Sequence, residues 1–210
     1  MFLTLEGIDF SGKSTQAKLL VDALSRERAV CFLREPGGTP ISERIRSILL
    51  DKKNLELTDR AELLLFSASR AQLVTGVIRP ALARGEIVIC DRYYDSTTAY
   101  QGAGRGLPMD AVRTINAFAT GGLVPDLTLF IDIPVEEIER RRAAAGKGFD
   151  RMEAAGREFF QRVRDGYVAL AASEPDRFVR IDGTRNPEEV HAGVVAAVTA
   201  SPMFHAHHTV

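Results

Sequence analysis

One short loop near the start of the chain constrains the fold more than any other feature. In "EGIDFSGKST", residues 6–15, two glycines bracket four residues and are followed at once by a lysine and a serine. This is the spacing G-x-x-x-x-G-K-S, which forms a phosphate-binding loop when it follows a strand and opens a helix. The apolar run "FLTLEG" and the periodic stretch "GKSTQAKLLVDALSRE" meet both conditions. The sequence therefore predicts an α/β fold that begins with a nucleotide-phosphate site.

The residue types in this loop predict how it would hold phosphate. Successive backbone N–H groups and a helix N-terminus converge on one point, and glycines let the backbone approach the phosphate oxygens. Lys13 is expected to reach the terminal phosphates, and the Ser14 hydroxyl can ligate Mg²⁺. A chance turn is the alternative, and the flanking strand and helix disfavour it. The predicted nucleotide-binding residues are Gly7, Ile8, Asp9, Phe10, Ser11, Gly12, Lys13, Ser14 and Thr15.

The rest of the chain alternates short apolar runs with periodic helical stretches. Most of five such runs are apolar on both faces, which is typical of parallel strands covered by helices on both sides. The predicted strands are residues 2–7, 29–35, 86–92, 126–133 and 177–182. The predicted architecture is a P-loop NTPase fold of three layers, with a central five-stranded parallel sheet flanked by helices.

Length and charge favour one domain and exclude some partners. With 45% hydrophobic residues, a chain of 210 residues can bury one core, so residues 1–200 are predicted to form a single domain. Residues 201–210 are predicted to be a disordered tail, because their three histidines lack a scaffold and an acidic partner for a metal. The net charge is −1, from 27 basic and 28 acidic residues, which disfavours nucleic acid as a partner.

The chain is expected to be cytoplasmic and to have no membrane partner. No apolar run approaches 18 residues, and the first ten residues lack the charged start of a signal peptide. Cys31 and Cys90 lie inside apolar runs, where small buried core residues are a better interpretation than a disulfide.

Three further stretches suggest a second site opposite the loop. "REPGGTPISERIR" (34–46) contains a proline-glycine turn and a helix with Arg46, and "LLFSASRAQ" (64–72) spaces Phe66 and Arg70 by four on one helix face. Asp91 and Arg92 end the third predicted strand, where open α/β sheets bind ligands. Taken alone, Phe66 would suit the core and Arg70 the solvent, but together an aromatic ring and guanidinium groups suit a base and its phosphate.

These stretches together resemble the thymidylate kinase family over nearly the whole chain, from Phe2 to about Val198. The motifs "EGIDFSGKST", "REPGGT", "LLFSASRAQL", "DRYYDSTTAYQGAGRG" and "FDRME" occur here in the order found in that family. The combination of "REPGGT" with "DRY" and "AYQG" is far more specific than the phosphate loop alone. The resemblance implies a kinase that transfers the γ-phosphoryl group of ATP to dTMP, with Mg²⁺ as cofactor, in dTTP synthesis.

The resemblance also implies a set of acceptor residues. The implied dTMP-binding residues are Asp9, Arg46, Phe66, Arg70, Arg92, Thr97, Tyr100 and Gln101. Phe66 would stack on thymine, while Arg46 and Arg92 would bind the phosphate. Asp9 would face the 3′-hydroxyl or the phosphate, Tyr100 would crowd the 2′ position, and the other three would lie close to the base or the phosphate.

A basic lid is expected near residues 140–152. Some relatives carry a basic residue within the phosphate loop, but Phe10 stands there in this chain, so the charge on the transferring group must be neutralised from elsewhere. Arg142, Lys147 and Arg151 are the candidates, around a hinge at Gly146 and Gly148. A solvated helix face is the alternative for the arginines. The expected catalytic residues are Asp9, Lys13, Arg92, Arg142, Lys147 and Arg151.

Three further expectations concern metal, adenine and assembly. Asp91 is a candidate to hold Mg²⁺ with Ser14, and a structural ion pair is the alternative for Asp91. The resemblance places the adenine-contacting loop in "IDGTRNPEEV" (181–190) and implies a homodimer formed by helices on one side of the sheet, with 109–121 and 61–77 as the expected contact segments.

Alternative functions remain open at this point. A kinase of the same fold that acts on another nucleoside monophosphate would differ only in its acceptor residues. A nucleotide-sensing module without catalysis would keep the phosphate loop but tolerate a broken lid, and a structural protein would leave Lys13 without an anion. A guanine-specific switch is disfavoured because no N-K-x-D run is present.

Overall fold

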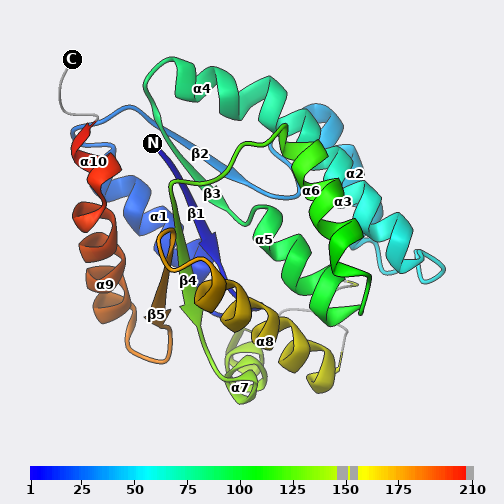
Figure 1. The fold of residues 1–210 in the computed structure, drawn as a ribbon. Coiled ribbons are helices and arrows are strands. Elements are labelled where there is room, and N and C mark those ends of the chain that lie inside the picture. Colours follow the sequence, from blue (N-terminus) through cyan, green and yellow to red (C-terminus); the bar gives the residue numbers. More distant parts are fainter. Residues whose placement is uncertain (146–150, 152–155, 207–210) are drawn as a thin grey trace.

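The computed structural model describes residues 1–145, 151 and 156–206, and it has one central sheet (Figure 1). All five strands pair in parallel, in the order β2-β3-β1-β4-β5. They are β1 (Phe2–Glu6), β2 (Val30–Arg34), β3 (Ile87–Asp91), β4 (Leu127–Asp132) and β5 (Phe178–Asp182). The five predicted strands are therefore confirmed, each one slightly shorter than its apolar run.

Helices cover both faces of the sheet, as the α/β class requires (Figure 1). They are α1 (Lys13–Leu24), α2 (Pro40–Leu50), α3 (Asp59–Leu73), the π-helix η1 (Val74–Ile78), α4 (Arg79–Ala83), α5 (Tyr94–Thr97), the π-helix η2 (Thr98–Gly104), α6 (Met109–Thr120), α7 (Val135–Ala145), α8 (Arg157–Ser173), α9 (Pro187–Ala200) and α10 (Pro202–Ala206).

Alternating side chains of the strands divide the core into two faces. Leu3 and Leu5 of β1 pack with α1 and α9 in one cluster, whereas Phe2 packs with Tyr93, η1 and α4 on the other face. Glu6, at the end of β1, lies on that second face and accepts hydrogen bonds from residues after β3 and on α8. The second face therefore carries the polar groups that build the site.

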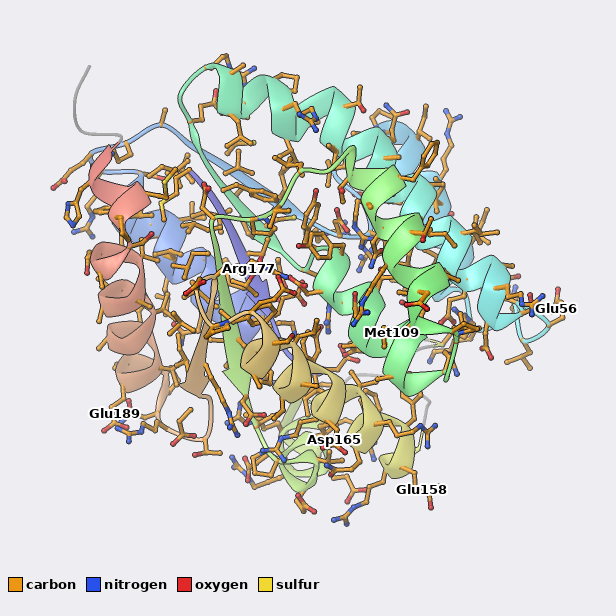
Figure 2. The ribbon with its side chains drawn as sticks, in the orientation of Figure 1. Glu56, Met109, Glu158, Asp165, Arg177 and Glu189 are labelled. Carbon is orange, nitrogen blue, oxygen red and sulfur yellow. The ribbon has the colours of Figure 1, made fainter. Side chains whose placement is uncertain are left out.

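A buried ion pair fixes the position of α5 against the sheet. Arg177, just before β5, donates two hydrogen bonds of 2.8 Å to the Asp95 carboxylate and a third to Thr128 on β4. Figure 2 shows Arg177 inside the molecule, whereas the labelled Glu158 and Glu189 lie at its outer edge. Because α5 leads into η2, this pair helps to place the residues of both elements.

The helical stretch Asp59–Ala83, which runs from α3 through η1 to α4, is long and apolar enough to cross a membrane by length and composition alone. The core helices of soluble proteins pass the same test. Glu62 and Arg70 lie within this stretch and are buried inside the protein, which is the environment of a core helix.

The C-terminal segment differs from its prediction. Residues Pro202–Ala206 form the helix α10 instead of a disordered tail. Phe204 packs against the core cluster under α9, and the Arg28 guanidinium lies 5.0 Å from the centre of its ring. This tertiary contact stabilises a segment too short for its periodicity to reveal a helix. Residues 207–210, with His207 and His208, lie outside the described part of the chain.

Candidate active site

The phosphate loop connects β1 to α1 and depends on its glycines. Gly7 has φ of 143°, and a Cβ atom at this position would lie 2.4 Å from the carbonyl oxygen of Ile131. Gly12 has φ of 96° where α1 begins. Phe10 adopts φ of 62°, an uncommon conformation for a residue with a side chain. The backbone thus takes the shape in which its N–H groups converge on an anion.

Lys13 is held inside this loop. Its Nζ donates to the carbonyl oxygen of Ile8 at 2.7 Å and to Ser11 Oγ at 3.3 Å. Burial and the nearby Arg92 guanidinium lower the pKa of Lys13 to about 8. An anion in the loop would oppose this shift, because a nearby negative charge stabilises the ammonium form.

The two predicted metal ligands touch each other. Ser14 Oγ donates a hydrogen bond of 2.5 Å to Asp91 Oδ2, so the end of β3 meets the start of α1. A hydroxyl and a carboxylate are hard oxygen donors of the kind that Mg²⁺ takes beside waters and phosphates. The residues present therefore fit this ion. Within the described residues, no cluster of three or more His, Cys, Asp or Glu side chains could hold a metal by itself.

A cavity of about 490 Å³ opens beside the loop, beyond the carboxyl ends of β1, β2 and β3. Its walls include every predicted acceptor residue: Asp9, Arg46, Phe66, Arg70, Arg92, Thr97, Tyr100 and Gln101. From the loop and the metal pair it includes Phe10, Gly12, Lys13, Ser14, Thr15 and Asp91, while Gly7, Ile8 and Ser11 are buried and do not line it. One cavity therefore joins the predicted phosphate loop to the predicted acceptor residues.

Arg92 links these two groups of residues. Its Nη2 donates to Asp9 Oδ1 at 2.5 Å and to the Tyr100 hydroxyl at 3.1 Å, and its Nη1 donates to the carbonyl oxygen of Gly7 at 2.9 Å. Ser96 Oγ lies 3.1 Å from the same Nη1. Arg92 also has φ of 73°, a left-handed conformation that side chains rarely adopt. The backbone and these four partners hold its guanidinium at the cavity wall.

Arg70 lies in the cavity wall and not in solvent. Its side chain is 1% exposed and forms an ion pair of 2.7 Å with Glu35, which follows β2. It also donates to Thr97 Oγ1 at 3.0 Å and to the carbonyl oxygen of Tyr93 at 3.1 Å. The α3 helix is therefore tied to the ends of β2 and β3 on either side of the cavity.

Among the described residues, the structure does not place the expected lid residues at the cavity. Lys147 lies outside the described residues, and neither Arg142 nor Arg151 lines the cavity. Arg151 donates to the buried Glu62 carboxylate at 2.5 Å and to the carbonyl oxygen of Leu49 at 2.8 Å. Removing one partner of a buried ion pair is costly, so the contact with Glu62 holds Arg151 against α3, outside the cavity lining.

Arg141 contacts the phosphate loop although the sequence did not single it out. Its Nη1 donates to the carbonyl oxygens of Phe10 and Ser11, both at 3.2 Å, and its Nη2 donates to that of Gly183 at 2.5 Å. Arg141 thus joins the loop to the predicted adenine segment. Arg140 and Arg141 both pair with Glu137, but Arg140 is 68% exposed and Arg141 is 22% exposed, so the register of α7 decides which arginine reaches the loop.

Glu6 is a second residue that the sequence did not reveal. Its carboxylate accepts hydrogen bonds from the backbone of Tyr93 at 2.7 Å, from Ser96 at 2.6 Å and from the Tyr167 hydroxyl at 2.7 Å. Burial and the nearby Asp95 raise the pKa of Glu6 to about 7. Glu6 lies directly before the loop, at the end of an ordinary apolar run, and nothing in the sequence around it indicates a buried carboxylate.

A phosphate loop that shares one cavity with a guanidinium-rich pocket defines a P-loop kinase of small phosphorylated acceptors. A sequence model of the thymidylate kinase family matches residues 5–194. The chain belongs to the thymidylate kinase family. The members of this family are kinases, so the chain is an enzyme. The family does not fit the two alternatives, a sensing module without catalysis and a kinase of another acceptor.

Individual relatives agree over nearly their full length. The thymidylate kinase of Chlorobium chlorochromatii is 48% identical, covering 98% of this chain and 97% of the relative. That of Solidesulfovibrio magneticus is 51% identical, covering 94% and 98%. The crystal structure of thymidylate kinase from Ehrlichia chaffeensis superposes with a TM-score of 0.78 at 35% identity, covering 95% of this chain and 98% of that one.

Proposed function

We propose that this enzyme transfers the γ-phosphoryl group of ATP to dTMP, giving ADP and dTDP. The observation that carries the proposal is the single cavity in which the phosphate loop faces Arg92, Phe66 and the other acceptor residues. Phosphoryl transfer needs two phosphorylated molecules aligned in line, and one cavity with anion-binding groups at both ends supplies that alignment.

On the donor side, the loop backbone and Lys13 would bind the phosphates of ATP. Lys13 leaves its present acceptors, the carbonyl oxygen of Ile8 and the Ser11 hydroxyl, for phosphate oxygens. Ser14 and Asp91 would hold Mg²⁺. When bound, this ion would neutralise negative charge on the phosphates of ATP. The adenine ring would lie toward residues 181–190.

On the acceptor side, Arg92 and Arg46 would bind the dTMP phosphate. Both face the cavity, and two guanidinium groups suit a dianion that must leave water. Phe66 would stack on thymine, and Tyr100 would exclude a 2′-hydroxyl, since its OH is held by Asp9 at 3.0 Å. Arg70, Thr97 and Gln101 would complete the base site, and Asp9 would face the sugar or the phosphate.

The charge on the transferring group must be neutralised by a basic residue of segment 140–152. Arg142, Lys147 and Arg151 are the residues that we propose for this role, although Arg151 would first have to leave Glu62. An arginine so placed is worth about 10³-fold or more in rate. Separate alanine variants of the three, assayed for kcat at saturating substrates, distinguish them. The variant with the largest loss of kcat identifies the residue.

The function is tested by ADP release from ATP and Mg²⁺ with each of dTMP, dUMP, dCMP, dGMP, UMP or no acceptor. The proposal expects turnover with dTMP far above that with UMP, and little release without acceptor. If ATP binds and no acceptor stimulates ADP release, the proposal fails. An acceptor preference other than dTMP would retain the kinase and reject the substrate.

We also propose that the enzyme is a cytoplasmic homodimer that associates through α3 and α6. Phe118 on α6 is 90% exposed and Leu64 on the adjacent α3 is 56% exposed, which is costly for large apolar side chains in a monomer. Sedimentation of the unmodified protein and of Phe118→Arg tests the assembly. The proposal expects a dimer that the substitution converts to monomer, and a monomer in both samples contradicts it.

A further inference from the structure

The α3 helix buries a carboxylate that the proposed reaction does not use. The Glu62 side chain is 0% exposed and accepts hydrogen bonds from three residues. Arg105 donates from Nε at 3.2 Å and from Nη2 at 3.1 Å, Arg151 donates at 2.5 Å, and the Gln101 amide donates from Nε2 at 2.8 Å. Two guanidinium groups and one amide therefore converge on a single buried carboxylate.

This carboxylate remains ionised in its buried position. Burial alone would raise the pKa of Glu62, but the hydrogen bonds from Arg105 and Gln101 outweigh burial and lower the pKa below its usual value. An ionised carboxylate accepts hydrogen bonds and cannot donate them. Any group that contacts it must therefore present an N–H or O–H.

The ionised Glu62 carboxylate fixes the orientation of the Gln101 amide. A glutamine amide has a donor end and an acceptor end, and its two orientations are otherwise nearly equivalent. With Nε2 bound to Glu62, the carbonyl oxygen points away from α3, and Gln101 lines the acceptor cavity. Within the described part of the chain this oxygen accepts no hydrogen bond. It is available for a donor on the ligand.

We propose that Glu62 is a positioning residue that turns the carbonyl oxygen of Gln101 toward the acceptor base and so selects a base with a hydrogen-bond donor at N3. Thymine and uracil carry N3–H, whereas cytosine has an unprotonated acceptor nitrogen at the same place. Cytosine would put two acceptors face to face, and the Gln101 amide cannot flip without losing its bond to Glu62. A site built to bind a donor rejects an analogue that lacks it more strongly than an apolar pocket could.

The inference rests on the proposed function, because it takes dTMP as the acceptor in this cavity. If the unmodified enzyme does not prefer dTMP over dCMP, the proposed function fails before Glu62 is tested. A clear preference in the unmodified enzyme is therefore the starting condition, and the variants then test Glu62 alone.

The experiment measures kcat/KM for dTMP, dCMP and 3-deaza-dTMP, in which the N3–H is replaced by C–H. Glu62→Gln keeps the shape of the side chain but can donate as well as accept, so the Gln101 amide is free to turn. The proposal expects the dTMP to dCMP ratio to fall about tenfold or more. It also expects the loss caused by 3-deaza substitution to shrink by a similar factor.

The matched control is Asp59→Asn. Asp59 lies at the start of the same helix, forms an ion pair with the same Arg105 at 3.4 Å, and is 49% exposed. We expect this variant to keep the ratio of the unmodified enzyme. If Glu62→Gln lowers kcat/KM for dTMP and dCMP by the same factor, Glu62 has a structural role only, and the proposal is wrong.

A second variant covers the case in which Glu62→Gln does not fold, as judged by thermal melting. Gln101→Leu leaves Glu62 paired with its two arginines and removes the side-chain carbonyl oxygen of Gln101. The proposal expects the same collapse of the dTMP to dCMP ratio and no remaining effect of 3-deaza substitution. An unchanged ratio in Gln101→Leu overturns it.

Discussion

The two ends of the cavity are built by different means. The donor end is one contiguous loop of nine residues, whose backbone forms the anion site. The acceptor end draws side chains from α2, α3, α5, η2 and the ends of β2 and β3. Several of these side chains are held by acidic partners, as Arg70 is by Glu35 and Arg92 by Asp9.

The difference teaches that the two ends tolerate change differently. Backbone N–H groups are present whatever the side chains are, so the donor end depends on a few positions that set conformation, such as Gly7. The acceptor end depends on side chains that hold one another, so the loss of one partner changes the position of the next. Four substitutions test this contrast.

The largest effect is expected for Lys13→Ala. The Lys13 ammonium is the positive charge of the loop that would contact the γ-phosphoryl group during transfer. Without it, kcat should fall by about 10³-fold or more. Affinity for dTMP, measured by calorimetry without ATP, should stay within about twofold because the acceptor network is intact. An equal loss of dTMP affinity would show that the two ends are not independent.

Arg92→Lys should reduce kcat/KM for dTMP by about 10²-fold. An ammonium group cannot reproduce the fork with which Arg92 contacts Asp9, Tyr100 and the carbonyl oxygen of Gly7. ATP binding, measured by fluorescence titration without acceptor, should change little. If ATP affinity falls as far as dTMP affinity, Arg92 organises the phosphate loop as much as the acceptor site.

Arg141→Gln tests the contact between α7 and the loop. Loss of the bonds to the carbonyl oxygens of Phe10, Ser11 and Gly183 should raise the KM for ATP by about tenfold and leave the KM for dTMP unchanged. Arg140→Gln is the control, because Arg140 is 68% exposed and bonds to Glu137. Similar KM values for ATP in both variants would contradict the role of Arg141.

The smallest effect concerns stability and not turnover. Because the folded pKa of Glu6 is raised from 4.5 to about 7, its contribution to the free energy of unfolding is fully present below pH 4.5 and is lost as pH rises through about 7. The glutamine of Glu6→Gln cannot ionise. Between pH 4.5 and 7 the free energy of unfolding of this variant should therefore fall less than that of the unmodified protein, and the difference should be on the order of 1–2 kcal/mol. Urea unfolding of both proteins at pH 5 and pH 7.5 gives the change in the free energy of unfolding with pH for each. An equal change in the two proteins would argue against the raised pKa.

The donor end of the cavity and the strands of the sheet could be predicted from the sequence because each is encoded by a short run of consecutive residues. Five apolar runs and one loop spacing are read within ten residues each, and the structure has the strands where they were expected. The acceptor residues came from resemblance, since Phe66 or Arg70 alone suits a core or a surface equally well. The structure adds that they share one cavity.

The contacts that escaped prediction join residues far apart in the chain. Glu62 meets Arg151 across 89 positions, and Tyr167 meets Glu6 across 161. No periodicity records such a pairing, because it depends on how whole helices are placed. The helix at 202–206 escaped for a related reason, since a contact of Phe204 with the core stabilises it.

The side chain of Arg92 is ordered before any acceptor arrives. A long flexible side chain that must be immobilised by its ligand costs about 0.5–1.5 kcal/mol in conformational entropy on binding. Arg92 loses that freedom when the chain folds, since Asp9, Tyr100, Ser96 and the carbonyl oxygen of Gly7 already restrain it. The cavity is preorganised at this point, so part of the affinity for an anionic acceptor is drawn from the stability of the fold.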